Sequence, residues 1–212
     1  MLLILFVIAI SYLVGSIPTA YIFVRVLKGL DIRKFGSGNV GATNALRLLG
    51  RGWGITILLL DIIKGFLPVV VLGSILAPRT SLLQEQNLFI IIGLSAICGH
   101  NWTVFLNFKG GKGVATTLGV LLGLAFKIPG LNLVLGLTIL VWFISFFAVR
   151  IISLSSILAA ASFPIFTIIF RQSLLIALIG VLLSVSIILR HKSNLKRLIR
   201  GEEPKFRFNK PR

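Results

Sequence analysis

Carboxylates are scarce in this sequence of 212 residues. It has five Asp and Glu residues against 22 Lys and Arg, which gives a formal net charge of +17. A Mg²⁺ site needs oxygen ligands, chiefly carboxylates, in one place, and five scattered acids do not supply them. We therefore expect no metal and no cofactor. The scarcity also excludes the Asp-rich CDP-alcohol phosphotransferases, and it leaves a Ser-His-Asp triad without a convincing acid.

Cysteine and histidine are almost as rare. The one cysteine, Cys98, lies in an apolar run, so no disulfide can form within the chain; packing explains it better than nucleophilic chemistry, because no activating base stands beside it. The two histidines are the only side chains that titrate near neutral pH. Neither begins the H-x-x-x-x-D motif of many glycerolipid acyltransferases: Phe105 follows His100 by five residues, and Lys196 follows His191 by five.

Charged residues are absent from several long stretches, among them 2–24, 65–78 and 87–108, and 57% of the chain is hydrophobic. Apolar runs of about 18 or more residues indicate membrane spans. The sequence therefore predicts an all-α integral membrane protein, with residues 1–212 forming a single polytopic domain. No basic segment precedes the first apolar run, so we expect a retained span there and not a cleaved signal peptide.

We expect seven transmembrane helices and a cytoplasmic tail. The predicted spans are approximately 2–26, 53–76, 88–106, 113–127, 131–149, 152–170 and 173–190, and the tail is 191–212. The fourth span is short for a hydrocarbon core of about 30 Å and is compatible with a half-span. Pro18, Pro68 and Pro164 lie inside spans and should kink them.

The distribution of basic residues predicts the orientation, because cytoplasmic loops collect Lys and Arg. With the N-terminus outside and the C-terminus in the cytoplasm, 18 bases fall inside and only Arg79, Lys127 and Arg171 fall outside. This asymmetry explains the positive charge without a nucleic-acid partner, which we do not expect. An anionic substrate is a second explanation, and the two are compatible.

The first polar segment, "KFGSGNVGATNALR" (34–47), combines glycines, neutral donors and bases but has no carboxylate. Glycine permits conformations in which successive N–H groups form an anion-binding concavity, and arginine can bind a phosphate through two hydrogen bonds. The alternative is an ordinary turn rich in Asn and Gly. The candidate residues are Ser37, Gly38, Asn39, Gly41, Thr43, Asn44 and Arg47.

The second polar segment, "GHNWTVFLNFKGGKGVATTLG" (99–119), places bases and glycines before a predicted helix. A helix N-terminus suits phosphate. This is not the nucleotide P-loop, because Leu106 and Gly113 stand where that motif needs Gly and Ser or Thr. Alternatively, the histidine packs and the lysines anchor the chain at the membrane interface. The candidates are His100, Lys109, Gly110, Gly111, Lys112 and Gly113.

The third polar segment, "RHKSNLKRLIRGEEPK" (190–205), follows the last span. His191, Asn194 and Arg197 recur every three residues, so one helical face can carry them. The alternative is a basic helix attracted to anionic lipid. The predicted topology places all three polar segments on the cytoplasmic side.

Asp61 and Lys64 lie three residues apart inside the second predicted span and share a helix face. Ionisable residues within a membrane often mark a functional site. A mutually neutralising structural pair explains them equally well.

In these segments the chain resembles the PlsY family, the bacterial glycerol-3-phosphate acyltransferases that use acyl-phosphate donors. The stretches "SGNVGATNALR" (37–47), "GHNWTVFLNFKGGKGVATTLG" (99–119) and "HKSNLKRLIRGEE" (191–203) match its three signature regions in order. "GSIPTAY" (15–21) and "DIIKG" (61–65) also resemble its pattern.

The resemblance implies a seven-helix enzyme of the bacterial inner (plasma) membrane whose active site faces the cytoplasm. It would transfer a fatty acyl group from acyl-phosphate to the 1-hydroxyl of sn-glycerol 3-phosphate, giving lysophosphatidic acid and phosphate. Membrane lipids surround it, and no obligatory protein partner is inferred. The leading alternative from another class is an organophosphate or phosphate transporter.

The resemblance also implies roles for individual residues. Glu203 would be architectural, and Gly110, Gly111 and Gly113 would line the glycerol phosphate site. Either His191 or a substrate phosphate takes the hydroxyl proton, and we favour the phosphate. The expected catalytic and phosphate-binding residues are Ser37, Arg47, Lys112, His191 and Asn194.

Overall fold

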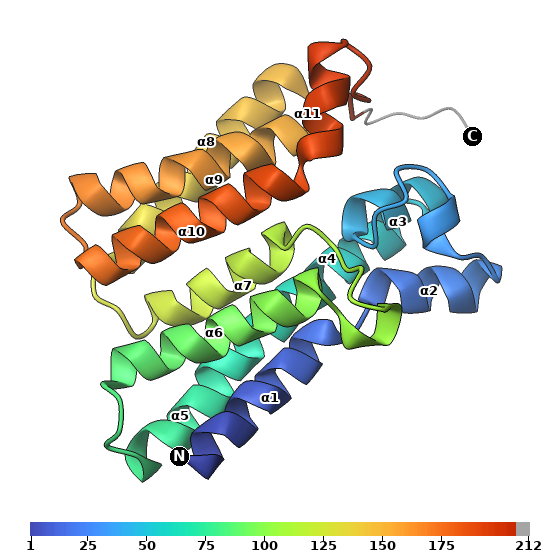
Figure 1. The fold of residues 1–212 in the computed structure, drawn as a ribbon. Helices are drawn as coiled ribbons and strands as arrows, with labels where there is room; N and C mark the ends of the chain where they lie inside the picture. The colour runs from blue at the N-terminus through green and yellow to red at the C-terminus, as the bar shows by residue number, and fades with distance from the viewer. Residues whose placement is uncertain (207–212) are drawn as a thin grey trace. The chain divides into compact units, whose positions relative to one another are not determined.

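The computed structural model describes residues 1–206, and the part of the tail formed by residues 207–212 lies outside the described residues. The chain forms two compact units, Met1–Ile128 and Pro129–Arg212 (Figure 1). Every regular element in the described part is helical, which confirms the predicted all-α class. We predicted a single polytopic domain for residues 1–212. The two units are described separately below, and the single domain stays a prediction.

The first unit contains α1 to α7. Its helices, in chain order, are α1 (Leu2–Ser16), α2 (Thr19–Lys28), the short η1 (Ile32–Lys34), α3 (Ala42–Leu49), α4 (Arg51–Leu67), η2 (Pro68–Leu72), α5 (Gly73–Leu76), η3 (Ala77–Arg79), α6 (Glu85–Asn101), η4 (Val104–Leu106) and α7 (Val114–Ala125). Two of the three predicted kinks have a visible counterpart: Pro18 separates α1 from α2, and Pro68 begins the wide turn η2, where its missing N–H interrupts the α-helical ladder.

Close backbone contact joins the long helices of the first unit. A Cβ atom on Gly99 of α6 would lie 2.1 Å from the carbonyl oxygen of Tyr12 in α1. A Cβ atom on Gly119 of α7 would lie 1.9 Å from the carbonyl oxygen of Ile62 in α4. Small residues let transmembrane helices approach this closely, and such packing replaces the hydrophobic effect that lipid does not provide.

A separate apolar core holds the polar end of the first unit together. It joins α2, the first polar segment, α3, α4 and η4. The buried members are Ala20, Val24, Ile32, Val40, Ala45, Ile57 and Leu106. Because this core includes residues of both the first and the second polar segments, it fixes one segment against the other.

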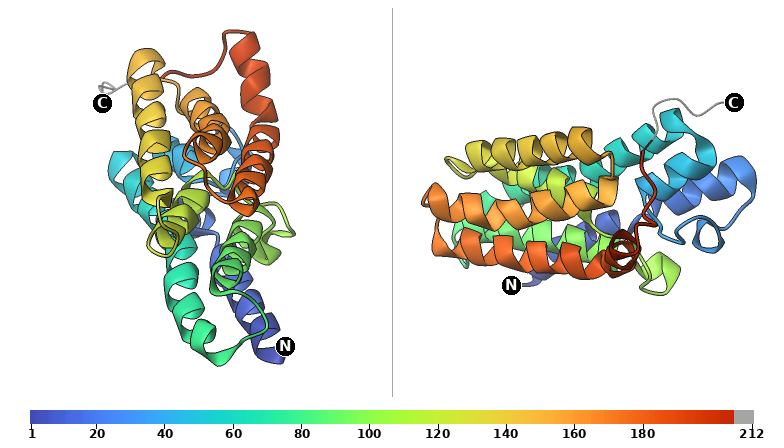
Figure 2. Two further views of the ribbon diagram at one scale, coloured as in Figure 1. Left: turned by 90° about the vertical axis from the view of Figure 1, so that its left-hand side faces the viewer. Right: turned by 90° about the horizontal axis from the view of Figure 1, so that it is seen from above.

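The second unit contains α8 (Leu131–Val149), α9 (Ile152–Ile169), α10 (Leu174–Arg190) and α11 (Lys192–Ile199). The helix α9 packs against both α8 and α10, and the two views in Figure 2 show the three side by side. The indole nitrogen of Trp142 in α8 donates to the hydroxyl of Ser156 in α9 over 3.3 Å. The third proline with a predicted kink, Pro164, lies inside α9, and the helix continues on both sides of it.

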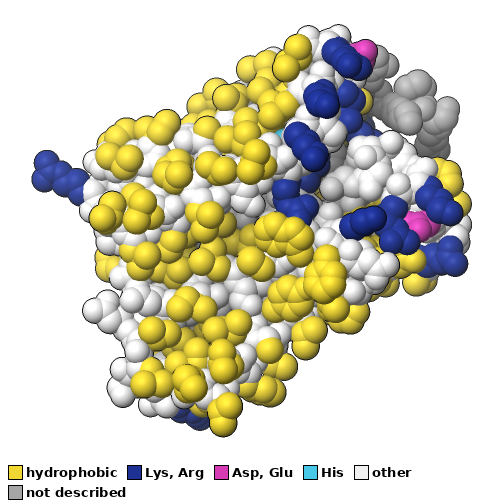
Figure 3. Space-filling view, in the orientation of Figure 1, with side chains coloured by type: hydrophobic (Ala, Val, Ile, Leu, Met, Phe, Trp, Pro, Cys, Tyr) yellow, Lys and Arg dark blue, Asp and Glu magenta, His cyan; other side chains and the backbone are white. Residues whose placement is uncertain are grey.

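On the face shown in Figure 3, hydrophobic side chains cover much of the surface along the helices of each unit, while Lys and Arg side chains gather over α2 and α3 in the first unit and over α11 in the second. Exposed leucine, isoleucine and phenylalanine residues occur in both units, for example Leu59, Phe126 and Ile168. An apolar exterior of this extent belongs in lipid and not in water.

Within residues 1–206, five helical segments are long and apolar enough to cross a membrane, which confirms a multi-pass protein. They are Leu2–Lys28, Arg51–Arg79, Glu85–Leu106, Leu131–Val149 and Ile152–Ile169. A sixth is obtained if α10 and α11, which are bent by 61°, form one broken span. The predicted span 113–127 corresponds to α7, which has only 12 residues. Seven spans and the orientation of the termini therefore stay predictions.

Candidate active site

The first polar segment is a loop organised around the carboxamide of Asn44. This side chain is buried, and its nitrogen donates to the carbonyl oxygens of Ile32, Phe35 and Asn39 over 3.0–3.3 Å. Its oxygen accepts from the N–H of Ser37 over 3.1 Å. Asn44 thus holds the loop closed from within, and its predicted role in substrate binding stays a prediction.

Positive φ angles shape the same loop. Gly36 and Gly38 have φ of +59° and +69°, in the left-handed region that favours glycine. A Cβ atom on Gly36 would also lie 2.3 Å from the Asn44 side-chain oxygen. The two glycines therefore allow the tight turn of the backbone that the hydrogen bonds of Asn44 stabilise.

The loop presents its remaining candidates near the surface. Ser37 and Arg47 are exposed, and Arg47 lies in the last turn of α3. Asn39 and Thr43 are half-buried. The structure does not bring the Arg47 guanidinium into a described ion pair with a carboxylate, so its charge is not neutralised within residues 1–206.

Arg33, in contrast, is neutralised locally. Its guanidinium lies 2.7 Å from Asp31, whose carboxylate also accepts from the Arg33 N–H over 3.0 Å and so caps η1. The hydrogen bonds and charge of Arg33 lower the pKa of Asp31 to about 2. This pair therefore stays ionised at all physiological pH values and does not compete for a phosphate.

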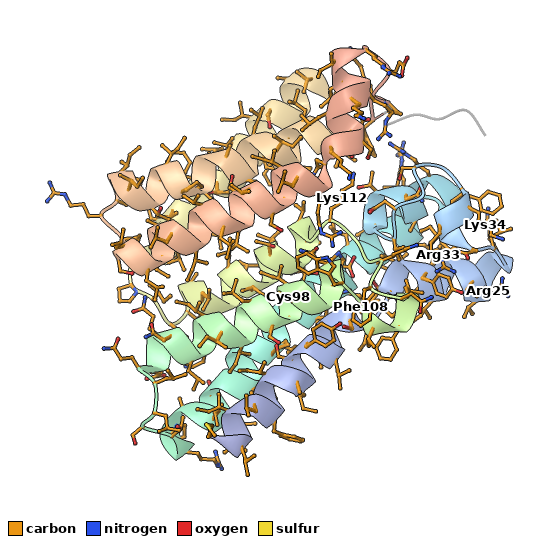
Figure 4. All side chains as sticks on the ribbon, viewed as in Figure 1. Arg25, Arg33, Lys34, Cys98, Phe108 and Lys112 are labelled. Carbon is orange, nitrogen blue, oxygen red and sulfur yellow. The ribbon has the colours of Figure 1, made fainter. Side chains whose placement is uncertain are left out.

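The second polar segment turns back on the end of α6. The N–H of Gly110 donates to the carbonyl oxygen of Asn101 over 3.2 Å, and the N–H of Gly111 donates to that of His100 over 3.1 Å. These hydrogen bonds form the glycine loop (residues 109–113), in which Lys112 is half-buried and Lys109 is exposed. Gly113, with φ of +81°, ends the loop and caps α7. Figure 4 shows Lys112 on the segment that leads into α7.

The first two polar segments meet in one small cavity of the first unit. Val40 comes from the first segment, and His100, Thr103, Gly110 and Gly111 come from the second. Residues outside both segments complete the lining: Ser16, Ile17, Pro18 and Lys64. Two segments that lie far apart in the sequence therefore line a common space.

Asp61 and Lys64 form a buried ion pair, as their spacing in α4 suggested. The Lys64 ammonium lies 2.7 Å from the Asp61 carboxylate, and both side chains are less than a tenth exposed. Nδ1 of His100 lies 3.8 Å from the same carboxylate oxygen. The sequence analysis treated the pair and the polar segments separately, and it did not identify Thr19, whose hydroxyl donates to the Asp61 carboxylate over 2.6 Å, as a partner of the pair. The sequence offered one signal for this contact: Thr19 is a polar residue that directly follows Pro18 inside a predicted span.

The second unit holds the third polar segment. The Nδ1 atom of buried His191 lies 2.8 Å from the carbonyl oxygen of Ile187, so Nδ1 carries the proton and Nε2 is the acceptor in the neutral ring.

Glu203 is the centre of a hydrogen-bond network in this unit. Its carboxylate accepts from Ser153 over 2.7 Å, from Asn194 over 2.6 Å and from Arg197 over 2.6 Å. Burial alone would raise the pKa of Glu203, but the three donors and the Arg197 charge outweigh it and hold the pKa below the usual range. Asn194 and Arg197 therefore take part in an architectural network, and their predicted contacts with substrate stay predictions.

Together these features define an integral membrane protein whose polar residues, rich in bases and poor in acids, suit an anionic ligand. A sequence profile described as "Glycerol-3-phosphate acyltransferase" matches residues 5–201. The chain belongs to this family, which confirms the resemblance seen in the three polar segments.

Individual relatives are similar over nearly the whole chain. A glycerol-3-phosphate acyltransferase of Gloeobacter violaceus is 42% identical over 200 residues, which cover 93% of this chain and 92% of the relative. Another from Desulforudis audaxviator is 40% identical over 209 residues, covering 99% and 98%.

Two solved structures share the fold. The crystal structure of PlsY, an integral membrane glycerol 3-phosphate acyltransferase, in its glycerol 3-phosphate form has a TM-score of 0.83 and 35% sequence identity, and the match covers 96% of each chain. Its lysophosphatidic acid form has a TM-score of 0.79.

Proposed function

We propose that this protein transfers a fatty acyl group from an acyl-phosphate donor. The acceptor and product follow from the family: glycerol 3-phosphate is acylated to lysophosphatidic acid. In the proposed reaction the 1-hydroxyl oxygen attacks the acyl carbonyl carbon, the bond from that carbon to the phosphate oxygen breaks, and inorganic phosphate leaves. Because the acyl group is already activated, no covalent enzyme intermediate is needed.

The cavity in the first unit is the observation that carries the proposal. It brings Val40 of the first polar segment and Gly110–Gly111 of the second to one place. Both substrates and the leaving group are phosphates, so catalysis requires cations and neutral donors placed where negative charge develops. The segments around the cavity have that composition, and Arg47 and Lys112 are the bases that we expect to bind phosphate.

We propose that residues of all three polar segments take part in the reaction. Ser37, Arg47 and Lys112 would orient the two phosphates, and His191 and Asn194 would act on the reacting hydroxyl. Correct placement of the hydroxyl within about 3–3.5 Å of the carbonyl carbon accounts for much of the rate enhancement that such a site needs.

Two groups compete for the proton of the hydroxyl. His191 has the tautomer that a base requires, since its Nδ1–H is held by Ile187 and Nε2 is the acceptor. A substrate phosphate has a second pKa near about 6, by analogy with phosphoserine, and we favour it because it is already positioned by binding.

The variant His191→Ala separates these two possibilities. If the phosphate is the base, the variant keeps measurable activity, and its kcat is flat with pH near neutrality. Complete loss of turnover with unchanged glycerol 3-phosphate binding would identify the histidine as the base instead. The measurement is kcat at several pH values, together with calorimetric binding.

We further propose that the protein resides in the bacterial inner membrane with seven spans, its N-terminus outside and its polar segments in the cytoplasm. The supporting observation is the excess of Lys and Arg in the loops on one predicted side. Acyl-phosphate and glycerol 3-phosphate would then both be taken from the cytoplasmic side.

A reconstitution experiment tests the reaction. Purified protein in lipid receives labelled glycerol 3-phosphate with acyl-phosphate, acyl-CoA or acyl carrier protein thioester, and lysophosphatidic acid and free phosphate are measured. We expect product only with acyl-phosphate. Equal rates with a thioester would refute the donor assignment. Uptake of labelled glycerol 3-phosphate into sealed vesicles without any donor and without product would favour the transporter.

A further inference from the structure

The break between α1 and α2 leaves main-chain carbonyl groups that a continuous helix would have satisfied. Pro18 has no N–H, and Ile17 leaves the helix with a ψ of 114°, so its carbonyl accepts only a short-range main-chain bond, from the N–H of Thr19 over 3.0 Å. The Ser16 carbonyl accepts from the Thr103 hydroxyl over 2.6 Å, and the Ile17 carbonyl accepts from the Lys64 ammonium over 2.8 Å. At membrane depth such groups need partners inside the protein.

Asp61 binds the residue that follows the break, at the start of α2. Its carboxylate accepts from the hydroxyl of Thr19, the first residue of α2, over 2.6 Å, and it lies 2.7 Å from the Lys64 ammonium. Asp61 and Lys64 are 2% and 6% exposed. We call Thr19, Asp61, Lys64 and the Ile17 carbonyl the buried joint. It clamps the residues on both sides of Pro18 to α4.

The hydrogen bonds and the ion pair of the buried joint fix the direction between particular atoms, which apolar packing does not. A buried ion pair is often no more stabilising than well-packed apolar residues of similar volume. What it does provide is fixed hydrogen-bond geometry between particular atoms. A role in placing neighbouring groups therefore explains its chemistry better than stability alone does.

The neighbouring groups are those of the glycine loop (residues 109–113). His100 lies 3.8 Å from Asp61 through Nδ1, and its carbonyl oxygen accepts from the N–H of Gly111. A Cβ atom on Gly111 would lie 2.2 Å from Nε2 of the same ring, so ring and loop are in close contact. Lys64, His100, Gly110 and Gly111 also line one cavity. His100 therefore links the buried joint to the glycine loop.

We infer that the buried joint positions the glycine loop and thereby sets the affinity for glycerol 3-phosphate, with Asp61 as a positioning residue that does not touch the substrate. This inference rests on the proposed function, in which the glycine loop binds that substrate. It also gives a purpose to the stretches "GSIPTAY" and "DIIKG", to which the proposed reaction assigns none.

The test is a set of variants designed to separate positioning from stability. Asp61→Leu combined with Lys64→Met removes both charges at once, so no uncompensated buried charge is left. The double variant also removes the side-chain partners of the Thr19 hydroxyl and the Ile17 carbonyl, so we expect it to fold with a somewhat lower melting temperature, while the KM for glycerol 3-phosphate rises at least about tenfold, equivalent to 1.4 kcal/mol of binding. The KM for acyl-phosphate should rise less than the KM for glycerol 3-phosphate, because Lys112 is the only proposed donor contact in the glycine loop, and kcat should stay within about threefold, because Ser37, Arg47 and His191 lie outside that loop.

A milder variant keeps the test open if the double variant does not fold. Thr19→Val removes only the hydrogen bond to Asp61 and should raise the same KM by a smaller factor. Thr56→Val is the matched control: it also removes one threonine hydroxyl bond, to the Gly52 carbonyl in α4, but away from the joint. We expect its kinetics to equal those of the wild type.

Gly111→Ala shows which proposal fails if the expected result is not found. If this variant raises the KM for glycerol 3-phosphate but the joint variants leave it at the wild-type value, the inference is wrong and the proposed site stands. If Gly111→Ala leaves that KM unchanged, the glycine loop is not the binding site, and the proposed site and the inference both fall.

Discussion

Several side chains that the sequence marks as candidate ligand donors form hydrogen bonds within the protein. The first polar segment predicted a group of neutral donors for a ligand, yet the carboxamide of Asn44 is used to close its own loop. The third segment predicted a helical face of site residues, yet Asn194 and Arg197 converge on Glu203. Composition and spacing indicate that such residues gather, but not which hydrogen bonds they use, because those depend on contacts between distant residues.

Arg47→Ala should damage phosphate binding more than any change to a nearby base. The guanidinium is exposed at the end of α3 and can make two hydrogen bonds to a phosphate, each charge-assisted. We expect kcat/KM to fall at least about a hundredfold, or about 2.7 kcal/mol. Lys34→Ala in the same polar segment is the control and should have little effect. Wild-type turnover in the arginine variant would count heavily against the proposed site.

Glu203→Gln should destabilise the second unit by about 2 kcal/mol, because a charged acceptor of three hydrogen bonds is replaced by a neutral one. The folded pKa of Glu203 lies below the unfolded value, so its contribution is fully present above the unfolded pKa and is lost as pH falls through the folded one. Thermal unfolding in detergent should therefore show a large difference from wild type at pH 7 that narrows in acid.

Glu202→Gln is the matched control for this prediction, since its neighbouring carboxylate is exposed. It should melt like the wild type at every pH. A difference between the Glu203 variant and wild type that does not change with pH would mean that charge is not the cause.

At the scale of helices, apolar runs in the sequence predict that a membrane-spanning helix exists and how long it is, but not which helices pack together. The long spans were found in the sequence because nothing but lipid tolerates such runs. The glycine positions that allow α1 to contact α6, and α4 to contact α7, carry no such signal, since a glycine in an apolar run looks the same whether or not a neighbouring backbone approaches it. The partners in these helix pairs could not be predicted.

Gly119→Ala tests the contact between α4 and α7. The added methyl group would lie 1.9 Å from the Ile62 carbonyl oxygen, a main-chain atom that cannot turn aside. Overpacking of this kind costs about 1–3 kcal/mol or more, so we expect a lower melting temperature and a lower yield of folded protein.

Gly136→Ala in α8 is the matched control. A Cβ atom there meets no heavy atom within 4 Å, and alanine is the better helix former by about 0.5–1 kcal/mol in water. Its melting temperature should equal or exceed that of the wild type. Similar losses in both alanine variants would show that close contact is not the reason.

For the molecule as a whole, the charge asymmetry of the loops predicts an orientation that labelling can test. In a Cys98→Ala background, single cysteines are placed at Ser81, between η3 and α6, and at Ser193 in α11; both positions are exposed. A membrane-impermeant maleimide added to intact spheroplasts should label the Ser81→Cys protein only. The Ser193→Cys protein should react after permeabilisation. Labelling in the reverse pattern would overturn the proposed topology.

The helix α7 is shorter than its neighbours, and this has a consequence for where the reactants meet. Its 12 residues extend about 18 Å, against roughly 30 Å of hydrocarbon. In the proposed topology the glycine loop that precedes it would be recessed below the headgroups. An acyl-phosphate donor would then keep its tail among the lipids while glycerol 3-phosphate reaches the loop from the water, and the lysophosphatidic acid formed would leave sideways into the same leaflet.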